Sequence, residues 1–128
     1  MAGKIFNEIK KTEEFKKDFK KLKKRFRTLD EDLETFINVQ LKTYHKLNID
    51  NKGVVRISEL GIETPEIYKA RKFACKSLKG KGGNSGIRII YAYYREEDII
   101  EFIEMYFKGD KEKEDRERII KRYKRSQL

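Results

Sequence analysis

The chain has 128 residues, a length that suits a single domain covering residues 1–128 and excludes most multidomain enzymes. Hydrophobic residues make up 38% and charged residues 42%, so the chain can form a packed core and disorder throughout is not expected. The net charge of +10 favours a polyanionic partner: a nucleic acid, an acidic protein or an anionic membrane surface. Charge alone does not choose among them.

The first 47 residues predict one strand followed by two helices. Residues 4–9 alternate apolar and polar side chains, and Thr12, with two glutamates after it, is typical of a helix N-terminus. Large apolar side chains then recur at helical spacing on one face: Phe15, Phe19, Leu22 and Phe26. Thr28 and Glu31 have the spacing of a capping box, which predicts a second helix. Few residues separate the helices, so we expect an antiparallel hairpin that a sheet or another helix covers.

Residues 53–65 look like a connection with one short extended stretch, which Pro65 closes. Residues 66–108 hold three apolar-rich segments separated by a glycine-rich loop and a tight acidic turn, which predicts an antiparallel meander of three strands. Hairpin flexibility explains the glycine-rich loop, residues 79–86. The alternative is that its backbone amides approach a phosphate.

Residues 110–126 predict a charged C-terminal helix, because Glu112, Glu114 and Glu117 each precede a basic residue by four positions. This helix has few apolar residues, so we expect it to dock weakly or to wait for a partner. The complete prediction is an α+β domain, with an antiparallel sheet in the order β-α-α-β-β-β-α. The helical hairpin of residues 1–47 packs on one face of this sheet, and the other face is basic.

The single cysteine, Cys75, excludes an internal disulfide and a cysteine-based zinc site, and a single histidine, His45, cannot build a histidine metal site. We therefore expect no metal and no cofactor. We expect Cys75 to be a small core residue in a strand and His45 to lie on a helix surface. No run approaches the roughly 18 apolar residues of a membrane span, and the N-terminal residues lack the apolar core of a secretory signal. These features predict a cytoplasmic protein with no membrane partner.

Positive charge is concentrated in two blocks, residues 1–28 with a net charge of +7 and residues 61–88 with +5. Lysines of both blocks are candidate RNA contacts, because phosphate binding requires only charge that follows the backbone. The ordinary alternative is that the first block is the solvated face of a helix, and a membrane surface is a third possibility. The candidate RNA-binding residues are Lys16, Lys20, Lys23, Lys24, Lys72, Lys76, Lys79 and Lys81.

Short motifs in the meander resemble those of a known family. Tyr68-Lys69-Ala70-Arg71 is similar to a Tyr-Lys-x-Lys/Arg strand, residues 86–91 are similar to a Gly-x-Arg-aliphatic-aliphatic-Tyr strand, and the third strand ends on a basic residue, Lys108. These motifs resemble those of the RelE/ParE toxin superfamily of toxin–antitoxin modules, and the chain is more similar to its RelE-type ribosome-associated ribonucleases. The resemblance implies a RelE-like fold, cleavage of mRNA in the ribosomal A site, and a tightly bound cognate antitoxin.

Metal-independent RNA cleavage requires a base for the 2′-hydroxyl, cations for the charge on the phosphorane, and an acid for the departing 5′-oxygen. Strand alternation places Lys69 and Arg71 on one face, where Arg88 of the next strand can join them. Repulsion among the three cations lowers the lysine pKa, which would make Lys69 a usable base, while Arg71 and Arg88 hold phosphate oxygens. By resemblance, Lys69 and Arg71 stand where the family places basic catalytic residues, and Arg88 where it places its transition-state arginine.

The general acid is expected on the last strand of the meander, where Glu104, Tyr106 and Lys108 share one face. We prefer Lys108, then Tyr106, with Glu104 as an alternative base or a buffer of the positive charge. The chain departs from the family here. Several RelE relatives carry a histidine or arginine near the end of this strand and a catalytic tyrosine early in the final helix, and this chain has none of them there. A slow or inactive nuclease is therefore an open alternative.

Each of these residues also has a structural explanation. Lys69 and Arg71 could be charges that protect a strand edge, and Arg88 could form a structural ion pair with Glu104. Aromatic residues at strand spacing usually pack across strands, and stacking on RNA bases is the less common alternative for Tyr91, Tyr93 and Tyr94.

The function predicted from the sequence is that of a RelE-like toxin, a metal-independent, ribosome-dependent mRNA endoribonuclease. The alternatives are a non-catalytic RNA-binding remnant and a ParE-like toxin that inhibits a topoisomerase. The expected partners are a cognate antitoxin, mRNA and the ribosome.

Overall fold

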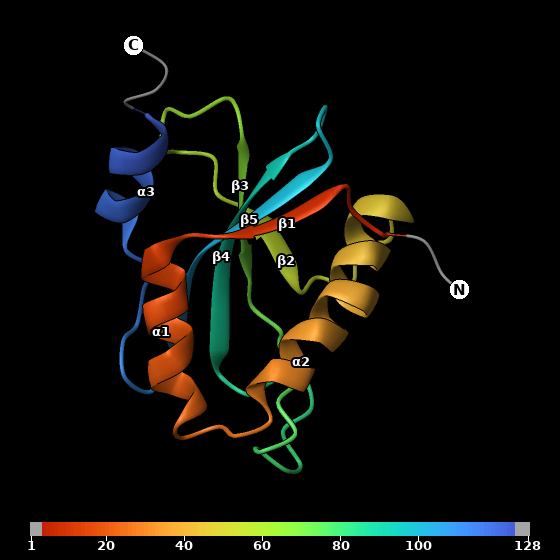
Figure 1. Cartoon of the computed structure of the whole chain (residues 1–128), viewed down its shortest axis with the longest axis vertical. Helices are drawn as coiled ribbons and strands as arrows, with labels where there is room; N and C mark the ends of the chain where they lie inside the picture. Colours follow the sequence, from red (N-terminus) through yellow and green to blue (C-terminus); the bar gives the residue numbers. More distant parts are fainter. Residues whose placement is uncertain (1–3, 125–128) are drawn as a thin grey trace.

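The computed structural model describes residues 4–124, and the predicted ends of the domain, residues 1–3 and 125–128, lie outside the described part. Figure 1 shows helices on both sides of a central sheet. In chain order the elements are β1 (Glu8–Lys11), α1 (Glu13–Lys23), α2 (Leu29–Thr35), the π-helix η1 (Phe36–Lys46), β2 (Val54–Arg56), β3 (Glu66–Ala70), β4 (Ile87–Tyr94), β5 (Ile99–Phe107) and α3 (Arg116–Tyr123).

The sheet has five strands in the order β1-β5-β4-β3-β2. Strands β3, β4 and β5 form the predicted antiparallel meander, and the short extended stretch of the connection adds β2 antiparallel to β3. The prediction of a wholly antiparallel sheet is wrong, because β1 pairs with β5 in parallel and the sheet is mixed. Parallel neighbours need a long crossover, and the helices together with the meander supply one between β1 and β5.

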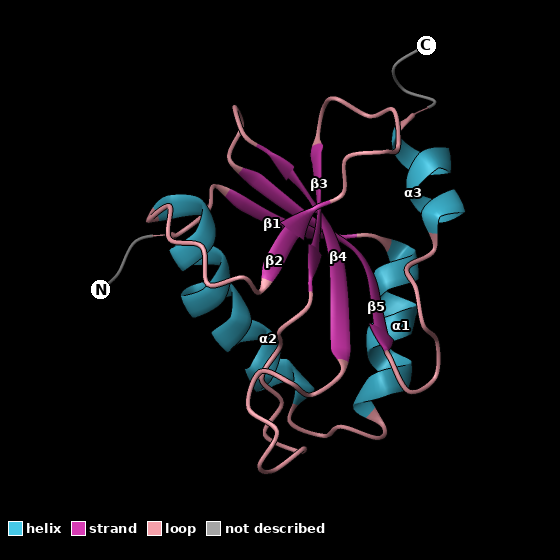
Figure 2. Ribbon diagram, turned by 180° about the vertical axis from the view of Figure 1, so that it is seen from behind, coloured by secondary structure: helices cyan, strands magenta, loops and turns pink. Residues whose placement is uncertain are grey.

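Helices α1, α2 and η1 cover one face of the sheet, as predicted for the hairpin (Figures 1 and 2). Alternation along β4 directs Ile89, Tyr91 and Tyr93 to this face, where they join Phe15 of α1 and Leu29 of α2 in the main core. Thr12 caps α1 as predicted, since its hydroxyl accepts from the backbone N–H of the third helical residue at 3.0 Å.

The opposite face of the sheet carries a second, smaller core. Ile67, Ile90 and Ala92 alternate with the residues of the main core and pack against Ile119 and Tyr123 of α3. Both α3 residues are buried, so the expectation of a weakly docked helix is wrong. Two well-placed apolar residues are enough to bury one face of an eight-residue helix.

The acidic and basic residues before α3 pair differently from the prediction. The helix begins only at Arg116, after Asp115 as N-cap, so Glu112 and Glu114 precede it and make no intrahelical pairs of the predicted kind.

The predicted capping box of the second helix is also absent. The hydroxyl of Thr28 donates to Asp32 at 2.7 Å, and it caps no backbone N–H of α2.

His45 is buried, which contradicts its predicted position on a helix surface. It lies in η1, whose wider winding shifts residues away from the faces that a 3.6-residue period predicts. Its Nε2 atom is 2.7 Å from the hydroxyl oxygen of Tyr91, within a group of aromatic rings that includes Tyr68 and Tyr93. Tyr91 and Tyr93 are thus packing residues. Cys75 is buried as predicted, although it follows β3 and lies in no strand.

The buried histidine is neutral at physiological pH. Burial, with the cations Arg95 and Lys46, lowers the pKa of His45 to about 4, and the carboxylates Glu66 and Asp98 only partly oppose this shift. Protonation therefore requires a cation to be placed in the aromatic core.

Acidification should destabilise the fold through His45. Its pKa of about 4 lies below the ordinary value of 6.5, so between these values the unfolded chain binds more protons and stability falls as pH falls. The loss should approach about 3 kcal/mol at the lower end of this window. His45→Gln keeps a hydrogen-bonding group for Tyr91 but does not titrate. Urea unfolding between pH 7 and pH 4 should show this component in the natural chain only, and equal pH dependence would contradict the assignment.

Candidate functional site

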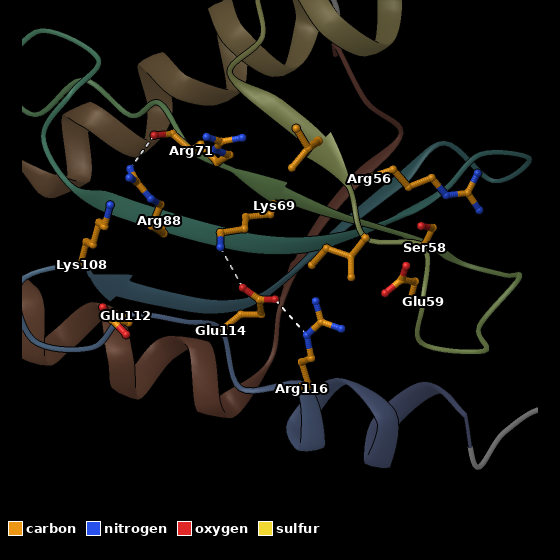
Figure 3. A pocket seen from close by; sticks show the side chains of 12 residues that line it. Arg56, Ser58, Glu59, Lys69, Arg71, Arg88, Lys108, Glu112, Glu114 and Arg116 are labelled. Atoms are coloured by element: carbon orange, nitrogen blue, oxygen red, sulfur yellow. Dashed lines mark hydrogen bonds and ion pairs between the residues drawn. The ribbon is translucent and has the colours of Figure 1, made fainter.

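The part of the second sheet face that α3 leaves uncovered is an open cleft of about 410 Å³ (Figure 3). Six cationic and three acidic side chains line it, which leaves a formal excess of three positive charges. Apolar and hydroxyl side chains complete the wall. The lining residues are Val55, Arg56, Ile57, Ser58, Glu59, Lys69, Arg71, Arg88, Lys108, Glu112, Glu114 and Arg116.

The sheet itself brings four predicted catalytic residues together in this cleft. Lys69 lies in β3, and Arg71 directly follows the last residue of this strand. Because the two residues are two positions apart, both side chains extend from the face of the sheet opposite α1, α2 and η1. The antiparallel register places Ala70 opposite Ile89, which sets Arg71 beside Arg88. Lys108 follows β5 and also lines the cleft.

Arg88 does not form the structural ion pair with Glu104 that its position in an apolar strand suggested. The Nη1 atom of Arg88 donates to the carbonyl oxygen of Arg71 at 2.5 Å. Arg88 lies opposite Tyr106 in the sheet, while Glu104 lies opposite Ile90. The side chain of Arg88 is therefore held at the cleft by a backbone oxygen.

Glu104 does not line the cleft. Its carboxylate is 1% exposed, forms an ion pair with Lys111, and accepts from the backbone N–H of Asp115 at 2.8 Å. Glu104 and Tyr106 lie opposite Ile90 and Arg88 in regular register, as the alternation predicts, but the connection between β5 and α3 covers Glu104. Glu104 thus anchors the connection of residues 108–115, which leads from β5 to α3, at Lys111 near its middle and at Asp115 at its end.

Lys69 is fixed by an ion pair on the floor of the cleft. Its Nζ atom lies 2.9 Å from Oε1 of Glu114, and Oε2 of Glu114 lies 3.2 Å from Nε of Arg116. Figure 3 shows this chain of three charges between β3 and the start of α3. Burial alone would raise the pKa of Glu114, but the hydrogen bond from Lys69, a backbone N–H and the charges of Lys69 and Arg116 together outweigh burial, so the pKa is lowered and the carboxylate is ionised.

The same ion pair overturns the prediction that Lys69 has a lowered pKa. Burial alone would lower it, but the contacts with Glu114 and Tyr106 outweigh burial and raise the pKa of Lys69 above its ordinary value. Lys69 is therefore a permanent ammonium group in this arrangement and cannot serve as a base. Sequence alternation identified the neighbouring cations, but the neutralising carboxylate comes from a connection 45 residues away.

Tyr106 is buried beneath the cleft and does not line it. Its hydroxyl forms no hydrogen bond of ordinary geometry among the described residues, although it interacts with the ammonium group of Lys69. Burial raises the pKa of Tyr106, and the nearby Lys69 only partly opposes that shift. The phenol is consequently a weaker candidate for the acid than the exposed Lys108.

None of the eight lysines predicted as RNA contacts lines the cleft. Those of α1 lie on the other side of the sheet, where Lys16 pairs with Glu13 and Lys23 with Asp30. In the second block, Lys76 lies 3.5 Å from Glu31, and the others are exposed. The basic blocks of the sequence and the cleft are thus separate surfaces.

Sequence patterns missed five charged residues of the cleft. Two of them, Arg56 and Glu59, come from β2 and the loop after it, while the rest belong to the β5–α3 connection and the start of α3. The only signal for Arg56 was its place in the short extended stretch, and nothing in the sequence pointed to the others. The missed residues are Arg56, Glu59, Glu112, Glu114 and Arg116.

No three His, Cys, Asp or Glu side chains of residues 4–124 are grouped so that they could hold a metal ion. No helix of this range combines the length and apolar character needed to cross a bilayer.

No family model and no curated protein matches the sequence. Among solved structures, the fold is similar to a chain in the crystal structure of the archaeal RelE–RelB complex from Pyrococcus horikoshii OT3, with 16% sequence identity and a TM-score of 0.46. The similarity covers 80% of this chain and 94% of that chain. A similarity of this size assigns neither family nor function, so function has to be inferred from the residues of the cleft.

Removal of the Tyr106 hydroxyl should not destabilise the protein. The interaction with Lys69 only partly offsets the desolvation of this buried hydroxyl, and Glu114 also binds Lys69, so Tyr106→Phe should change the free energy of unfolding by less than about 1 kcal/mol. Tyr123→Phe is the matched control, because that hydroxyl donates to Glu101 at 2.5 Å and its loss should cost about 2 kcal/mol. Urea denaturation measures both, and a large loss in Tyr106→Phe would reveal a hydrogen bond to this hydroxyl.

Proposed function

We propose that the chain is a RelE-like toxin, a metal-independent and ribosome-dependent mRNA endoribonuclease. The observation that carries the proposal is the convergence of Lys69, Arg71, Arg88 and Lys108 on one open cleft. Clustered cations bind a polyanion and stabilise the charge that develops on a phosphate during cleavage. These four residues are also those on which the resemblance of the sequence to RelE-type ribonucleases depends.

The two arginines are the proposed phosphate ligands. The bond from Arg88 to the carbonyl oxygen of Arg71 fixes one guanidinium N–H and leaves the other N–H donors of Arg88 for phosphate oxygens. Arg71 is exposed and lies beside it in Figure 3. A phosphate held by both groups would have its developing negative charge stabilised in the transition state.

Acid and base roles follow from which groups carry a transferable proton. Lys108 is exposed at the cleft and is the preferred acid for the departing 5′-oxygen, whereas Lys69 contributes only charge. The base must then be a carboxylate. Glu112 lines the cleft on the same side as Lys108 in Figure 3 and forms no ion pair within residues 4–124, so we assign it the proton of the 2′-hydroxyl.

A non-catalytic RNA-binding protein is the second candidate, and the Lys69–Glu114 ion pair favours it. An ammonium group that is neutralised and held above its ordinary pKa accepts no proton. In that case the cleft would bind the backbone of RNA without cutting it.

The cleft also supports the proposal of an antitoxin partner. Its excess of positive charge would attract acidic side chains, and a protein that covered the cleft would exclude RNA by occupying the same cations. We therefore propose that the cognate antitoxin binds over the cleft.

Cell-free translation should separate the candidate functions. The purified chain should arrest translation, and primer extension should map new 5′ ends on the ribosome-bound message but none on the same message without ribosomes. Arrest with intact message would favour the non-catalytic RNA-binding protein. Normal translation with an inhibited topoisomerase would favour the ParE-like alternative and exclude the ribonuclease.

Arg88→Ala should reduce cleavage strongly without unfolding the protein. Loss of one contact to the transition-state charge typically costs roughly 3 to 4 kcal/mol, which corresponds to a rate reduction of about 100- to 1,000-fold. Arg27→Ala removes the same charge from an exposed position outside the cleft and should cut at the normal rate. Cleavage is measured by primer extension and folding by urea denaturation. Normal cutting by Arg88→Ala would show that the proposed site is misplaced.

A further inference from the structure

The cleft already contains an anion that two cations share. Glu114 accepts from Nζ of Lys69 at 2.9 Å and from Nε of Arg116 at 3.2 Å. Its side chain is only 5% exposed, although the cleft around it is open. Cations from two separate elements, β3 and α3, thus converge on one pair of carboxylate oxygens (Figure 3).

Three other cations lie at this end of the cleft, and no carboxylate of the described residues binds them. Arg71, Arg88 and Lys108 form no ion pair within residues 4–124, and Figure 3 shows them together beside the Lys69–Glu114 pair. Lys69 and Arg71 are two positions apart along an extended chain, which corresponds to about 7 Å. That step is similar to the one between neighbouring phosphates of a nucleic-acid strand.

We propose that Glu114 occupies the position of a second RNA phosphate. The ligand of the cleft is then a strand with two consecutive phosphates. One lies on Arg71, Arg88 and Lys108, and the other replaces Glu114 on Lys69 and Arg116. This inference rests on the proposed function, because it specifies how the same cleft distinguishes a polynucleotide from a single phosphate.

The exchange is chemically conservative. Carboxylate and phosphate oxygens accept the same charge-assisted hydrogen bonds, so both cations of the subsite remain neutralised. The backbone on either side of Glu114 is anchored, since Glu104 binds Lys111 and the backbone N–H of Asp115. Glu114 can therefore leave by rotation of its side chain while the connection between β5 and α3 stays in place.

The carboxylate also gives selectivity. A single small anion has to displace a tethered competitor, which is present at the subsite at high effective concentration. A second phosphate that is covalently linked to a bound first phosphate has the same advantage and can compete. Glu114 thus keeps free phosphate and mononucleotides out of this second subsite, and the cost of displacing it lowers the affinity of the cleft for a strand with two charged linkages.

Binding of matched trinucleotides tests the subsite. The first probe is a 2′-O-methyl trinucleotide with two charged linkages, which the protein cannot cut because its 2′-oxygens are blocked. The other two carry one charged linkage and one uncharged methylphosphonate linkage, in either order. Glu114→Gln should bind the doubly charged probe about tenfold more tightly than the natural chain does, and each singly charged probe less than about twofold more tightly, a difference larger than the charge of the probe alone would give.

Two further variants show whether the effect belongs to the subsite. Glu59→Gln removes a negative charge from the same cleft, but Glu59 forms no ion pair within residues 4–124, so its effect on binding free energy should only scale with the charge of the probe. Arg116→Gln should weaken mainly the doubly charged probe. If the effect of Glu114→Gln also merely scaled with probe charge, the subsite would be overturned and the proposed function would stand. If none of these proteins bound any probe at low salt, the proposed function would fall as well.

Discussion

The structure of the cleft depends on how mutual repulsion among clustered cations is relieved. Lys69, Arg71 and Arg88 extend from adjacent strands, where like charges oppose one another. Glu114 neutralises Lys69, and the carbonyl oxygen of Arg71 holds Arg88. Both devices keep the cations in place without filling the cleft. The result is a site that is positively charged, fixed in geometry and still open to an anion.

One face of the sheet carries most of the hydrophobic core, and part of the other face forms the cleft. The face under α1, α2 and η1 carries the main core, and alternation along the same strands sends Ile67 and Ile90 to a smaller core under α3. Because α3 covers only part of that second face, the remainder becomes the cleft. Glu104 contributes to the cleft although it is buried, because its carboxylate positions the segment that carries Glu112 and Glu114.

The errors of the sequence-based predictions share a physical cause. Alternation and helical periodicity describe neighbours that are close in the chain, whereas the pKa of Lys69 is set by Glu114 and the environment of His45 by Tyr91. Each of these partners is more than 40 residues away. The π-helical winding of η1 then shifts His45 away from the helix face that a regular 3.6-residue period assigns.

Local spacing and the pairing of consecutive strands were enough to predict the α+β class, the antiparallel meander, the Thr12 cap and a cluster of Lys69, Arg71, Arg88 and Lys108. The parallel pairing of β1 with β5, the packing of α3 on the sheet and the acidic connection in the cleft could not be predicted in this way. Those features are contacts between distant segments, whose geometry is set by the packing of the whole chain.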